Sequence, residues 1–288
     1  MTSSLKKLPG GTLEFTITIA WSQVKGIYDK IFALLLAEVE LPGFRKGKAP
    51  LDLAVKQIDS AKVYEEVLKE LLPQVYAEAV KEHAAHPIIS PKVEVVEAAE
   101  NKDWKVRAIT CEKPEIVLGN YHKAISDLHA SKKVKIWLPG ENKTEDAKEN
   151  EVTIGELLDA LSKTITVTVS PILLEQEVNR MLSNLLNQTQ KLGLTVDDYL
   201  RSQNKTTEQL RSEYTKEAEK TLGMEFALEE IADSEKVTVD ESEIDTIINN
   251  AKTPDEKQNL QNQRYYIASV LRRQKTLQQL LKPRVIKA

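Results

Sequence analysis

The chain has 288 residues, of which 41% are hydrophobic, 29% are charged and 5% are aromatic, and its formal net charge is −4. This length exceeds one ordinary hydrophobic core and suits two domains. The low aromatic content and only 10 glycines argue against an all-β design. Because the net charge is slightly negative, any contact with nucleic acid would have to come from a local basic patch.

The cysteine content and the apolar stretches of the sequence indicate in which cellular compartment the protein works. Cys111 is the one cysteine of the sequence, which excludes a disulfide framework and a thiolate metal site and favours a small packed residue at a strand end. The first seven residues lack the apolar run of a signal peptide, and the most apolar stretch, Ile31–Ala37, is far too short to span a bilayer. We therefore expect a cytoplasmic protein without a membrane partner.

Residues 1–115 are predicted to form an α+β domain. The expected elements, in chain order, are a strand over residues 12–19, a helix over 21–38, a helical segment over 51–83 and strands over 93–96 and 104–110. The strands alternate apolar and polar residues, and the helices carry apolar residues three and four positions apart. Pro73 lies inside the second helical segment and predicts a kink or a split there.

Residues 116–169 carry weaker signals and are predicted to be a linker with a short β segment. Residues 132–140 suit a short strand, and 141–151 are typical of a mobile, charged linker. Residues 154–161 suit a short helix, whereas 164–169 are strand-like because β-branched residues alternate along them.

Residues 170–288 are predicted to form an elongated all-α domain with arm-like helices. Cap residues open its helices at Ser170, Thr206, Asp240 and Thr253. None of these helices is apolar on every side, so we expect a thin bundle whose inner flank stays partly apolar.

A thin bundle cannot bury every apolar side chain, so some of its positions are candidates for binding unfolded polypeptides. These candidates are Leu174, Met181, Leu185, Tyr199, Met224 and Tyr266. Methionine supplies adaptable contact with varied partners. For each of these residues, ordinary bundle core is the alternative interpretation.

The loop between the first two helices combines an aromatic ring with positive charge. Its residues are, in order, Gly43, Phe44, Arg45, Lys46, Gly47, Lys48, Ala49 and Pro50. An exposed Phe44 among three cations fits docking against a polyanionic surface with an apolar crevice, such as a ribosome. A tight turn with Phe44 folded back under the loop is the alternative.

These eight residues resemble the signature loop of the bacterial trigger factor family. Members of this family are ribosome-associated chaperones. The surrounding order agrees, with a strand before the loop, a helix opening at Pro50, and the segment Pro87–Val95 further along. Ser170–Leu281 also resembles the family's helical substrate-cradling domain.

The resemblance implies both partners and activity. Its implied ribosome-binding residues are Gly43, Phe44, Arg45, Lys46, Gly47 and Lys48. They would contact protein and rRNA of the large ribosomal subunit at the tunnel exit. The implied activity is that of an ATP-independent holdase that shields nascent or unfolded polypeptides, and a homodimer off the ribosome is an option.

The family usually carries an FKBP-like prolyl isomerase domain between its two other parts. Here Gly119–Lys163 offers only 45 residues, whereas a domain with its own pocket needs roughly a hundred. We therefore expect a shortened form that lacks this domain and is not an enzyme. A prolyl isomerase, or a helical adaptor or assembly factor that binds ribosomes through the same loop, are the alternative functions.

The sequence contains no recognisable catalytic motif. His83 and His86 lie three positions apart with Glu82 adjacent, a spacing that could in principle ligate a metal, but ordinary helix-end residues before Pro87 are the preferred interpretation. A P-loop, a nucleophile elbow and a glycine-rich dinucleotide turn are absent from the sequence. The prediction is therefore no catalytic residue, no metal and no cofactor.

Overall fold

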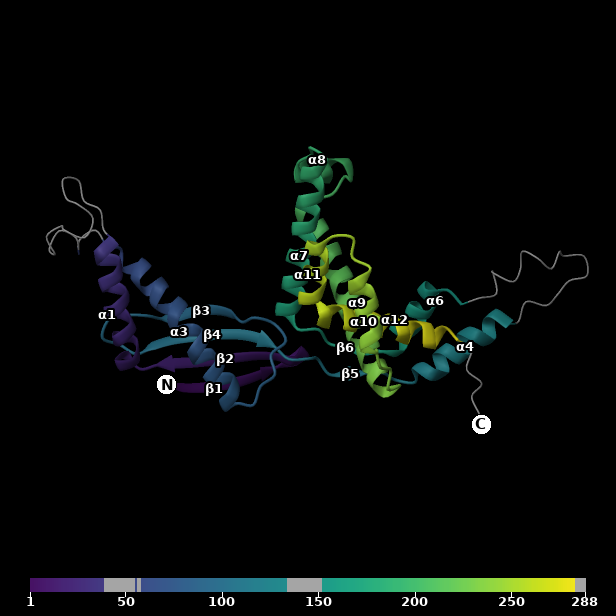
Figure 1. Cartoon of the computed structure of the whole chain (residues 1–288), viewed down its shortest axis with the longest axis horizontal. Helices are drawn as coiled ribbons and strands as arrows, with labels where there is room; N and C mark the ends of the chain where they lie inside the picture. Colours follow the sequence, from purple (N-terminus) through teal and green to yellow (C-terminus); the bar gives the residue numbers. More distant parts are fainter. Residues whose placement is uncertain (39–54, 56–57, 134–151, 283–288) are drawn as a thin grey trace, which may run out of the picture. The chain divides into compact units, whose positions relative to one another are not determined.

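The computed structural model describes residues 1–38, 55, 58–133 and 152–282, and the chain divides into two compact units (Figure 1). Unit 1 comprises Met1–Lys113 together with Ser170–Leu173. Unit 2 comprises Pro114–Val169 together with Leu174–Ala288. The expected order of an α+β part followed by a helical part is confirmed.

Unit 1 is built on one antiparallel sheet of four strands. These are β1 (Thr2–Leu8), β2 (Thr12–Ile19), β3 (Lys92–Glu97) and β4 (Trp104–Cys111), in the spatial order β1-β2-β4-β3. Phe15 of β2 lies opposite Leu5 on one side and Ala108 on the other, so these three side chains share a face. The predicted strands are confirmed, and β1 is an additional strand.

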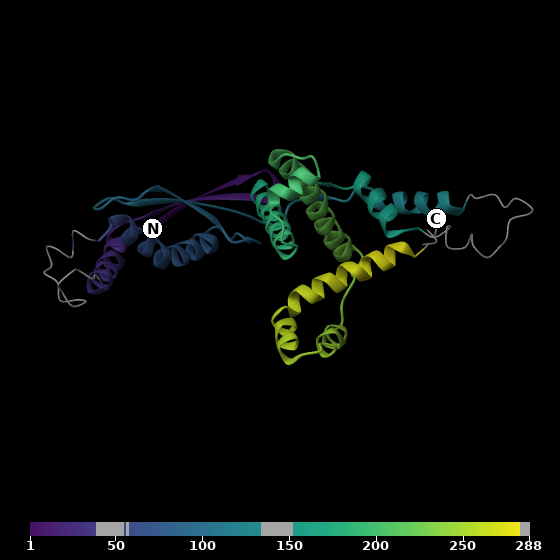
Figure 2. The same cartoon turned by 90° about the horizontal axis from the view of Figure 1, so that it is seen from above.

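Two helices cover one face of this sheet (Figure 2). They are α1 (Trp21–Glu38) and α3 (Ser60–Glu82). The Asp59 side chain accepts a hydrogen bond from the Ala61 N–H and caps α3. Pro73 does not split α3, because Leu71 and Val75 on either side of it are both anchored in the core.

The core of unit 1 is one continuous cluster between the sheet and the two helices. Its largest fully buried side chains include Trp104, Phe15 and Ile17 from the sheet and Val63 and Val67 from α3. The Trp104 indole N–H donates to the Ala99 carbonyl at 3.0 Å, so its one polar group is satisfied.

A short segment from later in the chain completes unit 1. Ser170 is buried, and its Oγ is hydrogen-bonded to Thr12 Oγ1 at 2.7 Å. Cys111, opposite Thr12 at the end of β4, is buried as expected, and burial raises the pKa of its thiol. Gly11 adopts φ +73°, and a Cβ there would lie 2.8 Å from the Glu112 carbonyl oxygen.

Unit 2 begins with a small β-ribbon and a pair of helices. The ribbon pairs β5 (Ile116–Val117) with β6 (Thr166–Val167), and the helices are α4 (Tyr121–Lys133) and α6 (Ile154–Thr164). The short helix predicted from residue 154 is confirmed, and α4 is additional. The predicted linker over 141–151 and most of the predicted strand over 132–140 lie outside the described residues.

The remaining described helices of unit 2 are α7 (Pro171–Lys191), α8 (Val196–Ser202), α9 (Thr207–Ser234), α10 (Glu241–Asn249), α11 (Pro254–Asn262) and α12 (Arg264–Leu281). The helices predicted to open at Ser170, Thr206, Asp240 and Thr253 are confirmed, but the last one breaks at Gln263 into two helices, and α8 is additional. Thr206 forms a capping box with Gln209 at the start of α9, and Thr195 forms one with Asp198 at the start of α8.

Three separate clusters of buried apolar side chains occur in unit 2. The first, which we call the junction cluster, is formed by Tyr121, Ile125, Leu157, Leu161, Leu228, Ile231 and Leu280. The second, the hairpin cluster, joins α7, α8 and the start of α9 through Leu185, Leu200 and Leu210. The third joins α10 and α12 through Ile244, Ile248 and Ile267. Unit 2 is therefore thin around each cluster, as the bundle pattern predicts.

Candidate functional site

The first group of candidates consists of the ribosome-binding residues of the loop after α1. Gly43, Phe44, Arg45, Lys46, Gly47 and Lys48 lie outside the described residues. The described ends on either side are the C-terminal half of α1 and the N-terminal half of α3, both in unit 1. The candidates for polypeptide binding, in contrast, all lie in the described part of unit 2.

The structure separates the six candidates for polypeptide binding into different environments. Leu185 is 7% exposed and belongs to the hairpin cluster, and Tyr199 packs against the same cluster. Met224 is half-buried against the junction cluster. Tyr266, at 63% exposed, presents the most surface, whereas Leu174 and Met181 on α7 are half-buried.

Tyr266 lies on α12, which packs against α9. The Glu177 carboxylate, with smaller contributions from Glu225 and Tyr266, raises the pKa of Arg180. Arg180 on α7 is thus within electrostatic reach of both α9 and α12. The neighbouring Tyr265 is 93% exposed.

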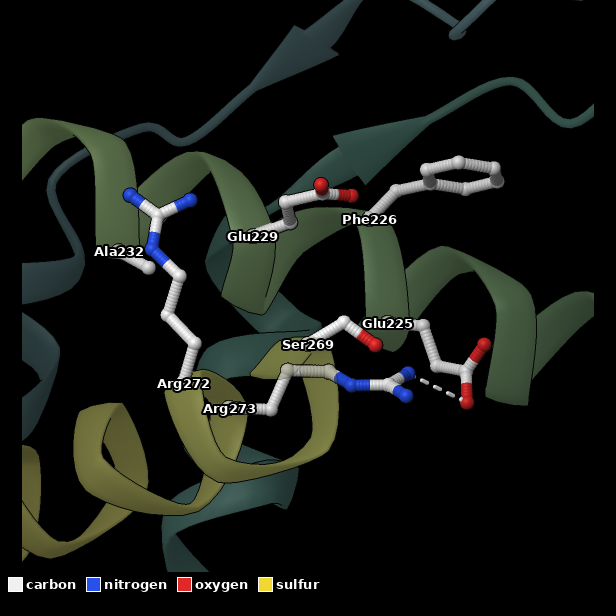
Figure 3. A pocket seen from close by; sticks show the side chains of 7 residues that line it. All are labelled: Glu225, Phe226, Glu229, Ala232, Ser269, Arg272 and Arg273. Carbon is white, nitrogen blue, oxygen red and sulfur yellow. Dashed lines mark ion pairs between the residues drawn. The ribbon is translucent and has the colours of Figure 1, made fainter. Parts of the chain in front are cut away.

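A pocket of about 140 Å³ lies between α9 and α12 on the same part of unit 2 (Figure 3). Its walls are Glu225, Phe226, Glu229, Ala232, Ser269, Arg272 and Arg273. Arg273 Nη1 donates to Glu225 Oε1 at 2.7 Å, and the Phe226 ring points away from this ion pair in Figure 3. The pocket therefore mixes fixed charges with an aromatic ring at its edge.

Arg272 closes one end of the pocket. Its Nη2 donates to Asp233 Oδ1 at 2.6 Å, and its Nε donates to the Val237 carbonyl at 2.9 Å. These bonds tie α12 to the end of α9 and position the guanidinium. The pocket walls contain no histidine and no cysteine.

A second, shallower groove of about 210 Å³ runs between α6, β6 and α9. Its apolar walls are formed by Ile165, Val167, Met224 and Ala227, and Gly223 leaves room beside Val167. Met224 is therefore a lining residue of an apolar groove, on a different face of α9 from the pocket of Figure 3. Lys220 at its rim pairs with Asp159 at 3.5 Å.

Several exposed apolar side chains were not among the candidates. Leu192 is 73% exposed, and Leu186 and Leu194 flank it at the end of α7. Gly193, with φ +70°, ends α7 between Leu192 and Leu194. Leu192 and Leu194 lie on either side of the glycine that ends the helix, so they do not belong to its apolar stripe. Their exposure could therefore have been predicted from the sequence.

The histidines do not gather with other ligands. His83 Nε2 is hydrogen-bonded to Ser3 Oγ at 3.0 Å, and the His86 backbone N–H donates to Glu112 Oε1 at 2.6 Å. Within the described part of the chain, no group of three or more His, Cys, Asp or Glu side chains is placed to hold a metal ion. None of the helices described here is both long and apolar enough to cross a membrane.

Comparison with known proteins gives two adjoining family matches. The model of the bacterial trigger factor protein matches residues 1–135, and the model of the trigger factor C-terminus matches residues 135–282. No prolyl isomerase family model matches the chain.

Curated relatives match over the N-terminal part. The trigger factor of Lactococcus lactis subsp. cremoris (strain MG1363) is 36% identical over 136 residues, which are 46% of this chain and 31% of the relative. The trigger factor of Shouchella clausii (strain KSM-K16) is 35% identical over 121 residues, which are 42% of this chain and 28% of the relative. The match thus spans about three tenths of the length of these relatives.

A solved structure matches over nearly the whole length. It is a structure of the trigger factor chaperone, described for promiscuous substrate recognition in folding and assembly activities. The TM-score is 0.64 at 15% identity, and the match covers 98% of this chain and 99% of that chain. At this identity the likeness shows the fold alone, whereas the two family models cover residues 1–282. The chain therefore belongs to the bacterial trigger factor family.

Proposed function

We propose that this protein is an ATP-independent, ribosome-associated holdase. In this role it docks at the tunnel exit of the large ribosomal subunit through the loop Gly43–Pro50, by protein and rRNA contacts, and shields nascent or unfolded polypeptides. A cytoplasmic location and a homodimer off the ribosome belong to the same proposal. The observation that carries it is the divided core of unit 2, which leaves apolar side chains in contact with water.

A holdase needs apolar surface that is scattered and adaptable. Leu192, Tyr265 and Tyr266 are exposed by more than half, and each lies beside charged or polar neighbours rather than in one deep cleft. Burying such surface contributes about 25 cal/mol per Å², so each contact is weak and a client is released when it buries its own apolar side chains. The solved relative is described as recognising substrates promiscuously, and we extend that property to this chain.

An aggregation assay with a chemically unfolded client tests the holdase. The wild-type chain should suppress light scattering at near-stoichiometric amounts. The triple variant Leu192→Ser, Leu194→Ser, Tyr266→Ser should lose at least half of that suppression, because it removes exposed apolar surface without touching a cluster. The matched control is Val117→Ser with Ile154→Ser, which are equally exposed positions elsewhere in unit 2. No suppression by the wild type would instead favour a ribosome-binding adaptor.

Ribosome co-sedimentation tests the docking loop. Replacing Phe44, Arg45 and Lys46 by alanine should abolish co-sedimentation and leave thermal stability nearly unchanged. Binding of the wild type should weaken with added salt, since Arg45, Lys46 and Lys48 act partly through charge. Normal co-sedimentation of the triple variant would end this part of the proposal.

We also propose that the chain lacks prolyl isomerase activity. The support is the short interval Gly119–Lys163 and the packing of α4 and α6 into the junction cluster, which uses their apolar side chains for a structural core. A proline-limited refolding assay at micromolar protein decides the matter. Acceleration of the slow phase beyond that given by an inert control protein would overturn the proposal.

A further inference from the structure

Unit 1 carries an open groove between the C-terminal half of α1 and the N-terminal half of α3. Its volume is about 720 Å³, which is within the range of ligand-binding clefts. The floor is formed by Ile31, Leu34 and Leu35 of α1. Leu34 lines the groove and is 59% exposed, so the described residues leave its apolar floor uncovered.

The floor residues follow helical spacing. Ile31, Leu34, Leu35 and Glu38 are three, four and seven positions apart, so they form one stripe along α1. The stripe is about 10 Å long, or two helical turns, since each residue rises 1.5 Å. Two helices that leave such a seam between them offer the place of a third helix.

The rim of the groove has an excess of negative charge. Its charged side chains are Glu38, Glu65, Glu66, Glu70, Lys62 and Lys69. Lys69 Nζ is shared between Glu65 at 3.0 Å and Glu66 at 2.8 Å, so one lysine neutralises only part of two carboxylates. These carboxylates raise the pKa of Lys69, and Lys30 from outside the groove pairs with Glu70 at 2.9 Å.

We propose that this groove binds a cationic amphipathic helix of a partner protein. The apolar face of that helix would cover Leu34 and Leu35, and its lysine or arginine side chains would meet the rim glutamates. Nucleic acid and anionic lipid are disfavoured as partners, since glutamates outnumber lysines on the rim. The proposal concerns unit 1 alone and does not require the holdase activity.

The test uses the full chain and two labelled helical peptides of 14 residues with the same leucine positions. One peptide carries lysines on its polar face, and the other carries glutamates. Fluorescence anisotropy should show micromolar binding of the lysine peptide, weakened at least tenfold between 50 and 300 mM salt. The glutamate peptide should bind at least tenfold more weakly. Equal binding of both peptides would overturn the proposal, because the site would then not select charge.

Two leucine variants locate the bound peptide. Leu34→Gln should weaken binding of the lysine peptide about tenfold, and Leu186→Gln, an exposed helical leucine of unit 2, should leave it within twofold. The reverse pattern, or an equal loss in both variants, would place the peptide on the polypeptide-binding surface of unit 2 and overturn the proposal. Because Leu34 is exposed, the variant should fold, and its thermal unfolding midpoint checks this.

Charge reversal and aggregation suppression complete the test. Glu65→Lys with Glu66→Lys should weaken the lysine peptide by at least fivefold and strengthen the glutamate peptide. Leu34→Gln should suppress aggregation as well as the wild type does. A wild type that fails to suppress aggregation but binds the lysine peptide through Leu34 would therefore refute the holdase and support the groove.

Discussion

Unit 1 and unit 2 bury their apolar side chains in different ways. In the described residues of unit 1, one cluster of 15 buried residues joins the sheet to α1 and α3. In unit 2, the clusters contain seven, three and three buried residues. The difference follows from the elements, because a four-stranded sheet presents one broad apolar face, whereas paired helices share only narrow stripes.

This difference predicts different responses to local damage. A single cluster loses contacts throughout when one large side chain is removed, so unit 1 should unfold as one cooperative body. Small clusters can open one at a time, with a free energy below that of global unfolding. Low local stability suits a surface that must adapt to varied polypeptides, which links the divided core to the proposed holdase.

The largest effect is expected for Trp104→Ala in unit 1. Trp104 is fully buried, and its removal should cost about 3–5 kcal/mol through lost burial and a cavity. Chemical unfolding followed by circular dichroism measures the cost. Val96→Ala, at an exposed position on β3, is the control and should change stability by less than about 0.5 kcal/mol. A cost below about 1 kcal/mol for Trp104→Ala would contradict a single continuous core.

The next effect tests whether residues 114–169 are structurally part of unit 2. Leu161 of α6 is fully buried in the junction cluster, so Leu161→Ala should cost about 2–5 kcal/mol. Ile154→Ala on the exposed side of the same helix should be nearly neutral. If both variants were neutral in chemical unfolding, α6 would be a tethered linker helix without a role in the core.

A smaller and more local effect is expected in the hairpin cluster. Leu210→Ala should cost about 2 kcal/mol, at the lower end for a buried leucine, because so few neighbours surround it. Hydrogen exchange should show lost protection in α8 and the start of α9 and unchanged protection near Ile231. Uniform loss of protection over all of α9 would mean that the clusters are coupled, and would remove the contrast between the two units.

The smallest effect concerns the start of α6. The pKa of Glu156 is lowered from 4.5 to about 2. The main cause is Lys132, whose Nζ lies 2.8 Å from Glu156 Oε1, and the backbone N–H and the hydroxyl of Thr153 also donate to this carboxylate. A lowered pKa means that the carboxylate stabilises the fold above about pH 4.5 and that this contribution is lost as the pH falls toward 2. Because Glu156 is exposed to solvent, the contribution is small.

Glu156→Gln keeps the capping-box geometry and removes the charge. The difference in unfolding midpoint between wild type and variant should therefore shrink as the pH falls from 4.5 to 2, with Glu217→Gln, at an exposed position of α9, as the control. A carboxyl titration of Glu156 by NMR provides the direct measurement. A midpoint near 4.5 in that titration would show that Lys132 does not hold the carboxylate.

Local signals predicted most of the elements but not their partners. The alternation of apolar and polar side chains predicted β2. The capping box of Thr206 and Gln209 predicted the start of α9. β1 was not predicted, because Ser3, Ser4 and Lys6 are polar and only its pairing with β2 makes it a strand. An edge strand of this kind is defined by the neighbour that it bonds rather than by its own composition.

The candidate surface shows the same division. Helical spacing indicated which positions of the helical part are apolar, but Leu185 and Tyr266 looked equivalent in the sequence. Leu185 is buried because α8 and α9 lie beside it, whereas Tyr266 is exposed because no described neighbour covers it fully. Whether an apolar side chain is core or surface depends on the second element, which spacing along one helix does not specify.

The sequence by itself indicated the family, through the loop Gly43–Pro50, and the starts of α7, α9, α10 and α11, through their cap residues. The loop motif and the helix caps each depend on a few adjacent residues, so they can be recognised without knowing which distant residues they contact. The tertiary structure alone decided that α4 and α6 enter the junction cluster, that Ser170 completes unit 1 by bonding Thr12, and that Leu34 stays open in a groove. These features depend on contacts between residues far apart in the chain, and burial is a property of such contacts rather than of any one segment.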